Sequence, residues 1–232
     1  MRIPDGLRPL SSGRLPNFLI ILAAVLAMAT AGPPEARAAM GIAAPGMALN
    51  TDDKRCSLGL SGHIGDIQYG VTAGHCFQGG KAVFAHDGFR MGVYEQGFGS
   101  DDTVEQLGFA LVRYEPNVAA AATLPDRLTI TSAEAVPAVG EEVCHIGSTT
   151  GTTCGPVTAV QNGYFVADFP SEKGDSGGIV YRRGGPGAAD FLGILIGTKE
   201  GGGIVVESAS YLRDTISAHT GGRFEWRLPP VP

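Results

Sequence analysis

Two short segments, about a hundred residues apart, contain side chains that could cooperate in nucleophilic catalysis. Residues 72–76 read TAGHC, and residues 174–178 read GDSGG. A serine flanked by glycines can be approached closely, and the tight backbone can turn its N–H groups toward a reacting carbonyl. A histidine can take the serine proton as a general base. The two segments together therefore predict acyl transfer at Ser176 with His75 as the base.

The elements that must position these residues are predicted to be short strands. The chain has 35 Gly and 15 Pro among 232 residues, which favours strands and turns over long helices. Apolar runs broken by Gly, Asp and Asn predict strands at 69–73, 81–85, 89–94, 109–114, 128–131, 142–146, 155–160, 164–169, 179–181, 191–196 and 204–207. Residues 40–54 are expected to be a lead-in, and the Ala-rich stretch within 116–125 a linker.

One helix is predicted near the end of the chain. Apolar and Thr side chains recur at helical spacing within residues 209–219, and Gly221-Gly222 would end the helix. With two strand-rich halves, the expected fold class is all-β, with two packed antiparallel barrels, a cleft between them and a C-terminal helix. The expected halves are residues 39–120 and residues 121–232, within one domain.

The N-terminal segment has the pattern of a secretory signal peptide. Three arginines precede an apolar run at residues 18–30, and Ala36-Arg37-Ala38 is a small-x-small cleavage pattern. The alternative is a membrane anchor, but the run is short for a span of about 20 residues. We expect residues 1–38 to be a signal peptide, and the protein to be secreted, extracellular or in the cell envelope. It would contact a membrane only if this segment were retained.

Charge argues against two classes of partner. Residues 1–38 hold four Arg and two acidic residues, so cleavage would leave 13 basic and 21 acidic residues, a net charge of about −8. Nucleic acids and anionic membrane surfaces attract basic proteins, so neither is expected as a partner.

Four cysteines stand at positions 56, 76, 144 and 154. An even number in an exported chain predicts disulfides, for which the sequence allows three pairings. A metal site is the alternative, but the chain has no Cys-x-x-Cys pair, nucleotide loop or EF-hand pattern. No metal and no organic cofactor is expected.

The chain resembles the chymotrypsin-like serine peptidases, and within them the bacterial branch of streptogrisins and α-lytic protease. The resemblance lies in the His75 and Ser176 motifs in that order, in CSLG at 56–59, and in GSTTG at 147–151. It covers residues 56–221 and implies the disulfides Cys56–Cys76 and Cys144–Cys154. It also implies a protein or peptide substrate, and we expect a monomer.

The resemblance implies a role for each residue of the site. Ser176 would be the nucleophile and His75 the base, and the backbone N–H groups of Gly174 and Ser176 would form the oxyanion hole. Asp175 would support the serine loop by pairing with a buried cation, whose position is held here by His145. If His145 pairs with Asp175 in this way, its pKa should be raised.

The chain departs from the branch where the triad aspartate should stand. Gly108 occupies that position, and Ile196 occupies the position of the serine that supports the aspartate. Asp102, in an acidic segment with Asp101 and Glu105, is the candidate for a replacement third member; the alternative is a solvated loop. We expect Gly108→Asp with Ile196→Ser to raise turnover.

The sequence therefore predicts a secreted serine endopeptidase that forms an acyl-enzyme at Ser176. Activity could be weak, because loss of the triad aspartate costs about 10⁴-fold in rate. The alternative is a catalytically impaired pseudo-peptidase that acts as a secreted protein-binding module. A structural envelope protein is a third reading, favoured only if the apolar N-terminus is retained.

Overall fold

The computed structural model describes residues 41–99, 107–199 and 201–229. The expected signal peptide, residues 1–38, and Asp102 lie outside these ranges. Residues 38–232 belong to one compact unit. No helix in the described ranges is long and apolar enough to cross a membrane.

The first sheet has eight antiparallel strands in the order β17-β4-β5-β8-β7-β6-β2-β3 and curves into a half-barrel. Seven of them come from the first half of the chain, and β17 returns from its end to pair with β4. The bounds are β2 Ala48–Asn50, β3 Arg55–Ser57, β4 Ser61–Ile64, β5 Ile67–Ala73, β6 Ala82–Phe84, β7 Arg90–Phe98, β8 Phe109–Tyr114 and β17 Phe224–Trp226.

The second sheet is a closed barrel of six strands in the order β15-β14-β11-β12-β13-β16, because β16 also pairs with β15. A further strand, β10, lies parallel to β15. The bounds are β10 Thr129–Ser132, β11 Glu142–Gly147, β12 Gly151–Val160, β13 Tyr164–Ala167, β14 Ile179–Arg183, β15 Ala188–Thr198 and β16 Ile204–Ser208.

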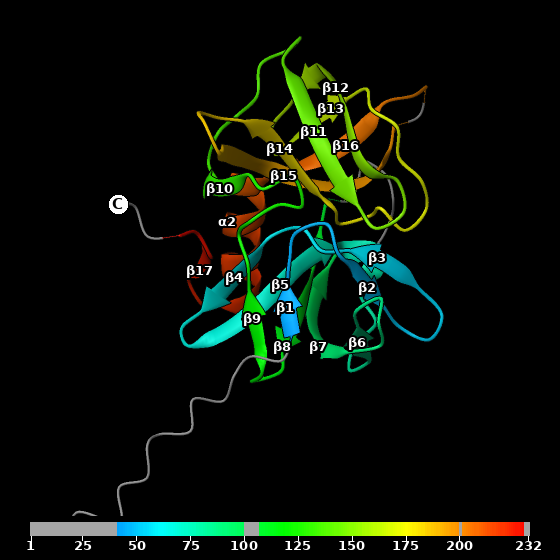
Figure 1. The fold of residues 1–232 in the computed structure, drawn as a ribbon, viewed down its shortest axis with the longest axis vertical. Coiled ribbons are helices and arrows are strands. Elements are labelled where there is room, and N and C mark those ends of the chain that lie inside the picture. Colours follow the sequence, from blue (N-terminus) through cyan, green and yellow to red (C-terminus); the bar gives the residue numbers. More distant parts are fainter. Residues whose placement is uncertain (1–40, 100–106, 200, 230–232) are drawn as a thin grey trace, which may run out of the picture. The chain divides into compact units, whose positions relative to one another are not determined.

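Three further elements complete the fold. The short turn η1 (Gly74–Cys76) follows β5 directly, and β1 (Gly41–Ala43) pairs in parallel with β9 (Val118–Ala120). The helix α2 (Ala209–Thr220) begins where β16 ends, and Gly221 terminates it in the left-handed conformation at φ 69°. Figure 1 shows the first sheet in the lower part of the view, the closed barrel above it and α2 alongside.

The predicted fold class is confirmed: the structure is all-β, with two packed sheet systems and a C-terminal helix. The predicted lead-in at 40–54 was wrong, because it contains β1 and β2, and the predicted linker at 116–125 contains β9. These strands have only three residues each and pair with distant segments. Local periodicity could not reveal them.

Successive side chains of β16 pack into two different clusters of buried residues. Ile204 and Val206 join the cluster inside the closed barrel, while Val205 joins the larger cluster that contains the first sheet. Successive side chains of a strand point to opposite faces. Glu207 is therefore on the face of β16 that Val205 occupies, toward the first sheet.

Candidate active site

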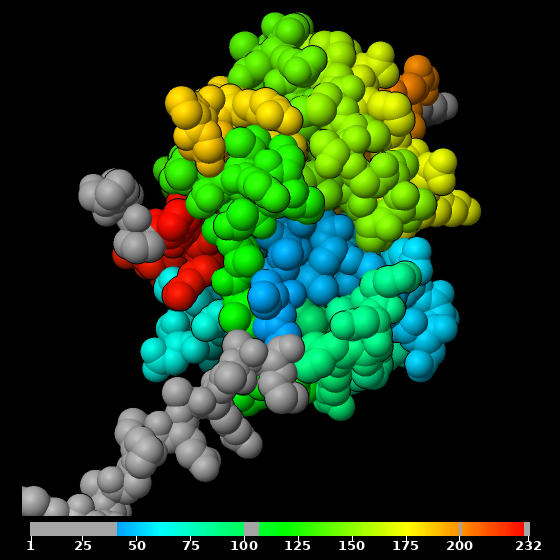
Figure 2. All heavy atoms as spheres, viewed as in Figure 1, coloured from blue at the N-terminus to red at the C-terminus, as the bar shows by residue number. Residues whose placement is uncertain are grey.

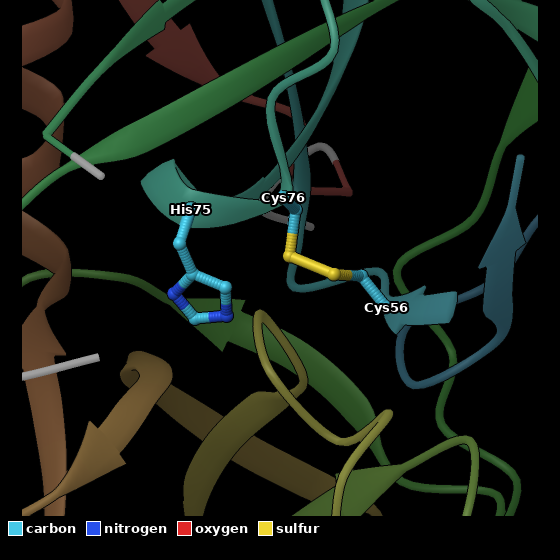
Figure 3. A group of neighbouring side chains, drawn as sticks. All are labelled: Cys56, His75 and Cys76. Carbon is cyan, nitrogen blue, oxygen red and sulfur yellow. A yellow bond between two sulfur atoms is a disulfide. The ribbon is translucent and has the colours of Figure 1, made fainter. Parts of the chain in front are cut away.

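His75 is the middle residue of η1, and Gly74, the first residue of η1, directly follows β5. The next residue, Cys76, is joined to Cys56 of β3 by a disulfide, with Cα atoms 6.3 Å apart. Figure 3 shows the imidazole and the disulfide extending from the same turn. The ligand atoms of these three residues lie within 4.8 Å of one another, but the two sulfurs are bonded together and offer no thiolate to a metal ion.

The second disulfide joins Cys144 to Cys154, which face each other in the β11–β12 register with Cα atoms 4.0 Å apart. Both pairings implied by the resemblance are thus confirmed. The first fixes the turn that carries His75, and the second closes the hairpin that ends in the loop at 147–151.

Ser176 is held between the two sheets, beside that turn. Its carbonyl oxygen accepts a hydrogen bond from Ser57 N at 2.8 Å and lies 4.0 Å from Cys76 Sγ. The next N–H, of Gly177, donates to Leu195 O at 2.6 Å. Ser176 therefore lies beside Cys76, the residue that follows His75. In Figure 2 residues coloured blue, from the beginning of the described chain, pack directly against yellow-green residues of the second half.

The backbone before Ser176 has the geometry of an anion site. Gly174 adopts φ +103°, a left-handed conformation that favours glycine, and its carbonyl accepts hydrogen bonds from Ser57 Oγ at 2.7 Å and Ser148 Oγ at 3.0 Å. Within the described ranges, the N–H groups of Gly174 and Ser176 donate to no other group. Two such N–H groups can stabilise a developing oxyanion.

Asp175 anchors this loop from within. Its side chain is fully buried and accepts four hydrogen bonds. The donors are Thr149 N at 2.9 Å, Thr150 N at 3.1 Å, Thr150 Oγ1 at 2.7 Å and Glu172 N at 2.9 Å. Burial would raise the pKa of this carboxyl, but the hydrogen bonds from Glu172, Thr150 and Thr149 outweigh it, so the pKa lies below its usual value.

His145 faces Asp175 without forming the expected ion pair. A Cβ built on Gly147 would lie 2.3 Å from Asp175 Oδ1 and 2.6 Å from His145 Cε1, so the two side chains flank one glycine. The imidazole stacks on Phe169 with ring centroids 5.3 Å apart, and neither ring nitrogen hydrogen-bonds to the Asp175 carboxylate. Burial lowers the pKa of His145 to about 4, although the charge of Asp175 opposes this. The prediction of a raised pKa was wrong, because burial of the imidazole outweighs the charge of Asp175.

Gly108 has no room for the missing aspartate. Its carbonyl accepts a hydrogen bond from Gly74 N at 3.0 Å, and a Cβ built on it would lie 2.0 Å from Phe98 O and 2.6 Å from Gly99 Cα. The backbone at the end of β7 therefore fills the space of a side chain. The double change Gly108→Asp with Ile196→Ser remains a prediction, and the new side chain at position 108 would fit only if this backbone moved.

The sequence analysis missed Glu207, a carboxyl group beside Gly108. Its side chain is fully buried, Oε2 accepts a hydrogen bond from Gly108 N at 2.7 Å, and Oε1 has no partner among the described residues. Burial raises the pKa of Glu207 from 4.5 to about 8, against the lowering effect of the Gly108 N–H. The sequence feature that could have identified Glu207 was its place as the one acidic residue in the otherwise apolar predicted strand at 204–207.

Comparisons with known proteins identify relatives of this chain. No model of a known protein family matches it. Two Mycobacterium tuberculosis proteins, Uncharacterized protein MT1863 of strain CDC 1551 and Uncharacterized protein Rv1815 of strain H37Rv, are each 35% identical over 185 residues. Each alignment covers 75% of this chain and 82% of the relative.

Solved structures similar to this one include bacterial proteases. Nocardiopsis protease (NAPase) matches with a TM-score of 0.59 and 24% identity, over 81% of this chain and 100% of that chain. Thermobifida fusca protease A matches at 0.57 and 22%, with the same coverage. A glutamic acid specific serine protease, described as using a histidine triad in substrate binding, matches at 0.56 and 27%, over 77% and 97%. The chain therefore has the fold of the bacterial chymotrypsin-like serine proteases and belongs to the same family as the two mycobacterial proteins.

Proposed function

We propose that the protein is a secreted serine endopeptidase in which Ser176 is the nucleophile and His75 the general base. The observation that carries this proposal is the arrangement of the serine loop. Gly174 holds the left-handed conformation, Asp175 anchors the loop through four hydrogen bonds, and two N–H groups are left for a substrate oxygen. The two disulfides and the apolar N-terminal segment support export.

The proposed reaction is acyl transfer to water. His75 takes the proton from Ser176 Oγ as that oxygen bonds to the substrate carbonyl carbon, and the N–H groups of Gly174 and Ser176 stabilise the resulting oxyanion. When the intermediate collapses, the C–N bond breaks and the proton on His75 passes to the leaving amine. Water then attacks the acyl-enzyme, with His75 again taking a proton, and releases the acid and free Ser176.

A second candidate function is protein binding without turnover. One observation favours it: the backbone of Phe98 and Gly99 occupies the space where an aspartate at position 108 would lie. A site that retained the cleft but lacked an aspartate at position 108 would bind substrates and turn them over slowly.

A fluorophosphonate probe distinguishes the two candidates. The purified protein is incubated with the probe over a range of pH, and the adduct is mapped by mass spectrometry, with Ser176→Ala as the matched control. We expect an adduct on Ser176 that the control lacks. A folded protein that remains unlabelled after long exposure would refute the peptidase proposal in favour of the binding module.

A further inference from the structure

Two cations, Lys54 and Arg55, lie beside the proposed catalytic residues. Lys54 directly precedes β3, Arg55 is the first residue of β3, and both side chains are exposed. Lys54 Nζ donates a hydrogen bond to the carbonyl oxygen of His75 at 2.5 Å. The stem of Arg55 packs over the serine loop, because a Cβ built on Gly174 would lie 3.3 Å from Arg55 Cδ and 3.5 Å from Arg55 Cγ. One cation therefore contacts the turn of the proposed base, and the other contacts the loop of the proposed oxyanion site.

Neither cation is paired with a carboxylate of the described ranges. Arg55 Nε donates to the side-chain oxygen of Asn50 at 3.2 Å, and Lys54 donates to a backbone carbonyl, so both acceptors are uncharged. Asp53, adjacent in sequence, is bonded to Lys81 at 3.0 Å instead. Acidic residues outnumber basic residues in the whole chain, 23 to 17, yet these two positive charges have no described acidic partner. They are available to a carboxylate of a bound molecule.

Arg55 also lies at an open edge of the first sheet. β3 is the last strand in the order of that sheet, and β2 is its one partner among the described strands. Along an antiparallel pair, backbone groups alternate between pointing to the partner strand and pointing away from it. Ser57 points away from β2, because its N–H donates to Ser176 O at 2.8 Å. Arg55, two residues earlier, therefore turns its backbone to the same side of β3 as the serine loop.

The proposed chemistry determines which part of a substrate meets these cations. The leaving amine takes its proton from His75, so the peptide chain after the cleaved bond departs on the side of His75. The disulfide between Cys56 and Cys76 ties β3 to the turn that carries this histidine. The chain after the cleaved bond therefore passes β3, within reach of an arginine side chain.

We propose that Arg55, together with Lys54, selects peptides that have an acidic residue at the first or second position after the cleaved bond. This inference rests on the proposed function and names the class of peptide that the site would cleave. A guanidinium can hold a carboxylate through two parallel hydrogen bonds, and the ammonium adds a second positive charge. Both cations are exposed, so the preference for Glu over Gln should be about 3- to 10-fold and should weaken in salt.

The first test compares the cleavage of matched peptides. Peptides of mixed sequence are incubated with the protein, and mass spectrometry maps the bonds that are cleaved. One cleaved peptide is then made with Glu, Gln or Lys at the first or the second position after that bond, and kcat/KM is measured at low and at high salt. In the native protein Glu should exceed Gln by about 3- to 10-fold at one of these positions, and high salt should reduce the ratio.

Charge variants show whether Arg55 causes the preference. Arg55→Gln should bring the ratio of Glu to Gln below about 2, and Arg55→Glu should favour the Lys peptide. The matched control is Arg223→Gln, which removes the same charge beside β17, at the opposite end of the strand order, and should keep the native ratio. Equal rates for the Glu and Gln peptides in the native protein, or the native ratio in Arg55→Gln, would overturn the inference.

A binding measurement separates this inference from the proposed function. Ser176→Ala protein, which cannot form an acyl-enzyme, is titrated into dye-labelled peptides of uncharged residues that carry either two Glu or two Gln, and fluorescence anisotropy gives the affinity. The Glu peptide should bind about 3- to 10-fold more tightly, and Arg55→Gln should remove the difference. A native protein that never labels and cleaves no peptide would refute the proposed function. The acidic preference would then rest on this difference in affinity, and equal binding of the two peptides would overturn it.

Discussion

Replacing Glu207 by glutamine should make the folded protein more stable at neutral and alkaline pH. The change removes the ionisable group but keeps the size of the side chain and an oxygen for the Gly108 N–H at 2.7 Å. Glu207 is fully buried and has no lysine or arginine partner in the described ranges. Loss of the Glu207 proton is therefore unfavourable in the folded state, where the carboxyl is buried, and not in the unfolded state, where water solvates the carboxylate.

The magnitude follows from the shift in the pKa of Glu207 from 4.5 to about 8. Because the pKa of Glu207 is higher in the folded state than in the unfolded state, its contribution to the free energy of unfolding is complete below pH 4.5. That contribution is lost as pH rises through 8. At 1.36 kcal/mol per unit, the loss is about 3 kcal/mol at pH 7 and about 5 kcal/mol above pH 8. Glu207→Gln should avoid this loss, so its advantage over the native protein should grow from below about 1 kcal/mol at pH 5 to these values.

The assay is equilibrium unfolding in urea at pH 5, 7 and 8.5, followed by the fluorescence of Trp226, the one tryptophan of the chain. Both proteins carry Ser176→Ala to prevent self-cleavage, and both keep their disulfides. Glu142→Gln, on the exposed start of β11, is the control and should follow the native curve at every pH.

Parallel stability curves for the native protein and Glu207→Gln would refute this reasoning. They would mean that the Glu207 carboxylate has a charge partner or a water path in the folded state.

Three further changes test the surrounding site. Gly108→Asp should lower the free energy of unfolding by more than about 3 kcal/mol, because its Cβ would meet Phe98 O at 2.0 Å; unfolding in urea measures this, and a stable, more active variant would contradict it. Asp175→Asn should slow labelling of the nucleophile by at least about tenfold, since an amide nitrogen cannot accept the N–H bonds that hold the loop, and equal rates would show that the loop is held by other contacts. Because the pKa of His145 is lowered to about 4 in the folded state, its contribution to the free energy of unfolding is complete above pH 6.5 and is lost as pH falls toward 4. In His145→Phe, which keeps the stacking on Phe169, the free energy of unfolding should therefore fall less steeply as pH is lowered, and the rate of Ser176 labelling at alkaline pH should stay unchanged.

Much of this protein could be predicted from local sequence. Apolar runs located every strand of the second sheet but only four of the eight strands of the first, and the Gly221-Gly222 pair marked the end of α2. The motifs around His75 and Ser176 predicted the chemistry only in combination, because a histidine can serve as the general base for a glycine-flanked serine. The two disulfides followed from the family resemblance and are confirmed.

Other features depended on contacts between segments that are distant in the sequence. Only the folded chain brings Phe98 O against Gly108 and so removes the space for an aspartate, and only the pairing of β16 in the closed barrel places Glu207 behind the turn of His75. The pKa of His145 fell rather than rose because tertiary burial, which no local pattern records, outweighed the charge of Asp175. The sequence by itself determined which residue types were available for catalysis, whereas burial and packing decided which of them meet, as Glu207 meets the Gly108 N–H.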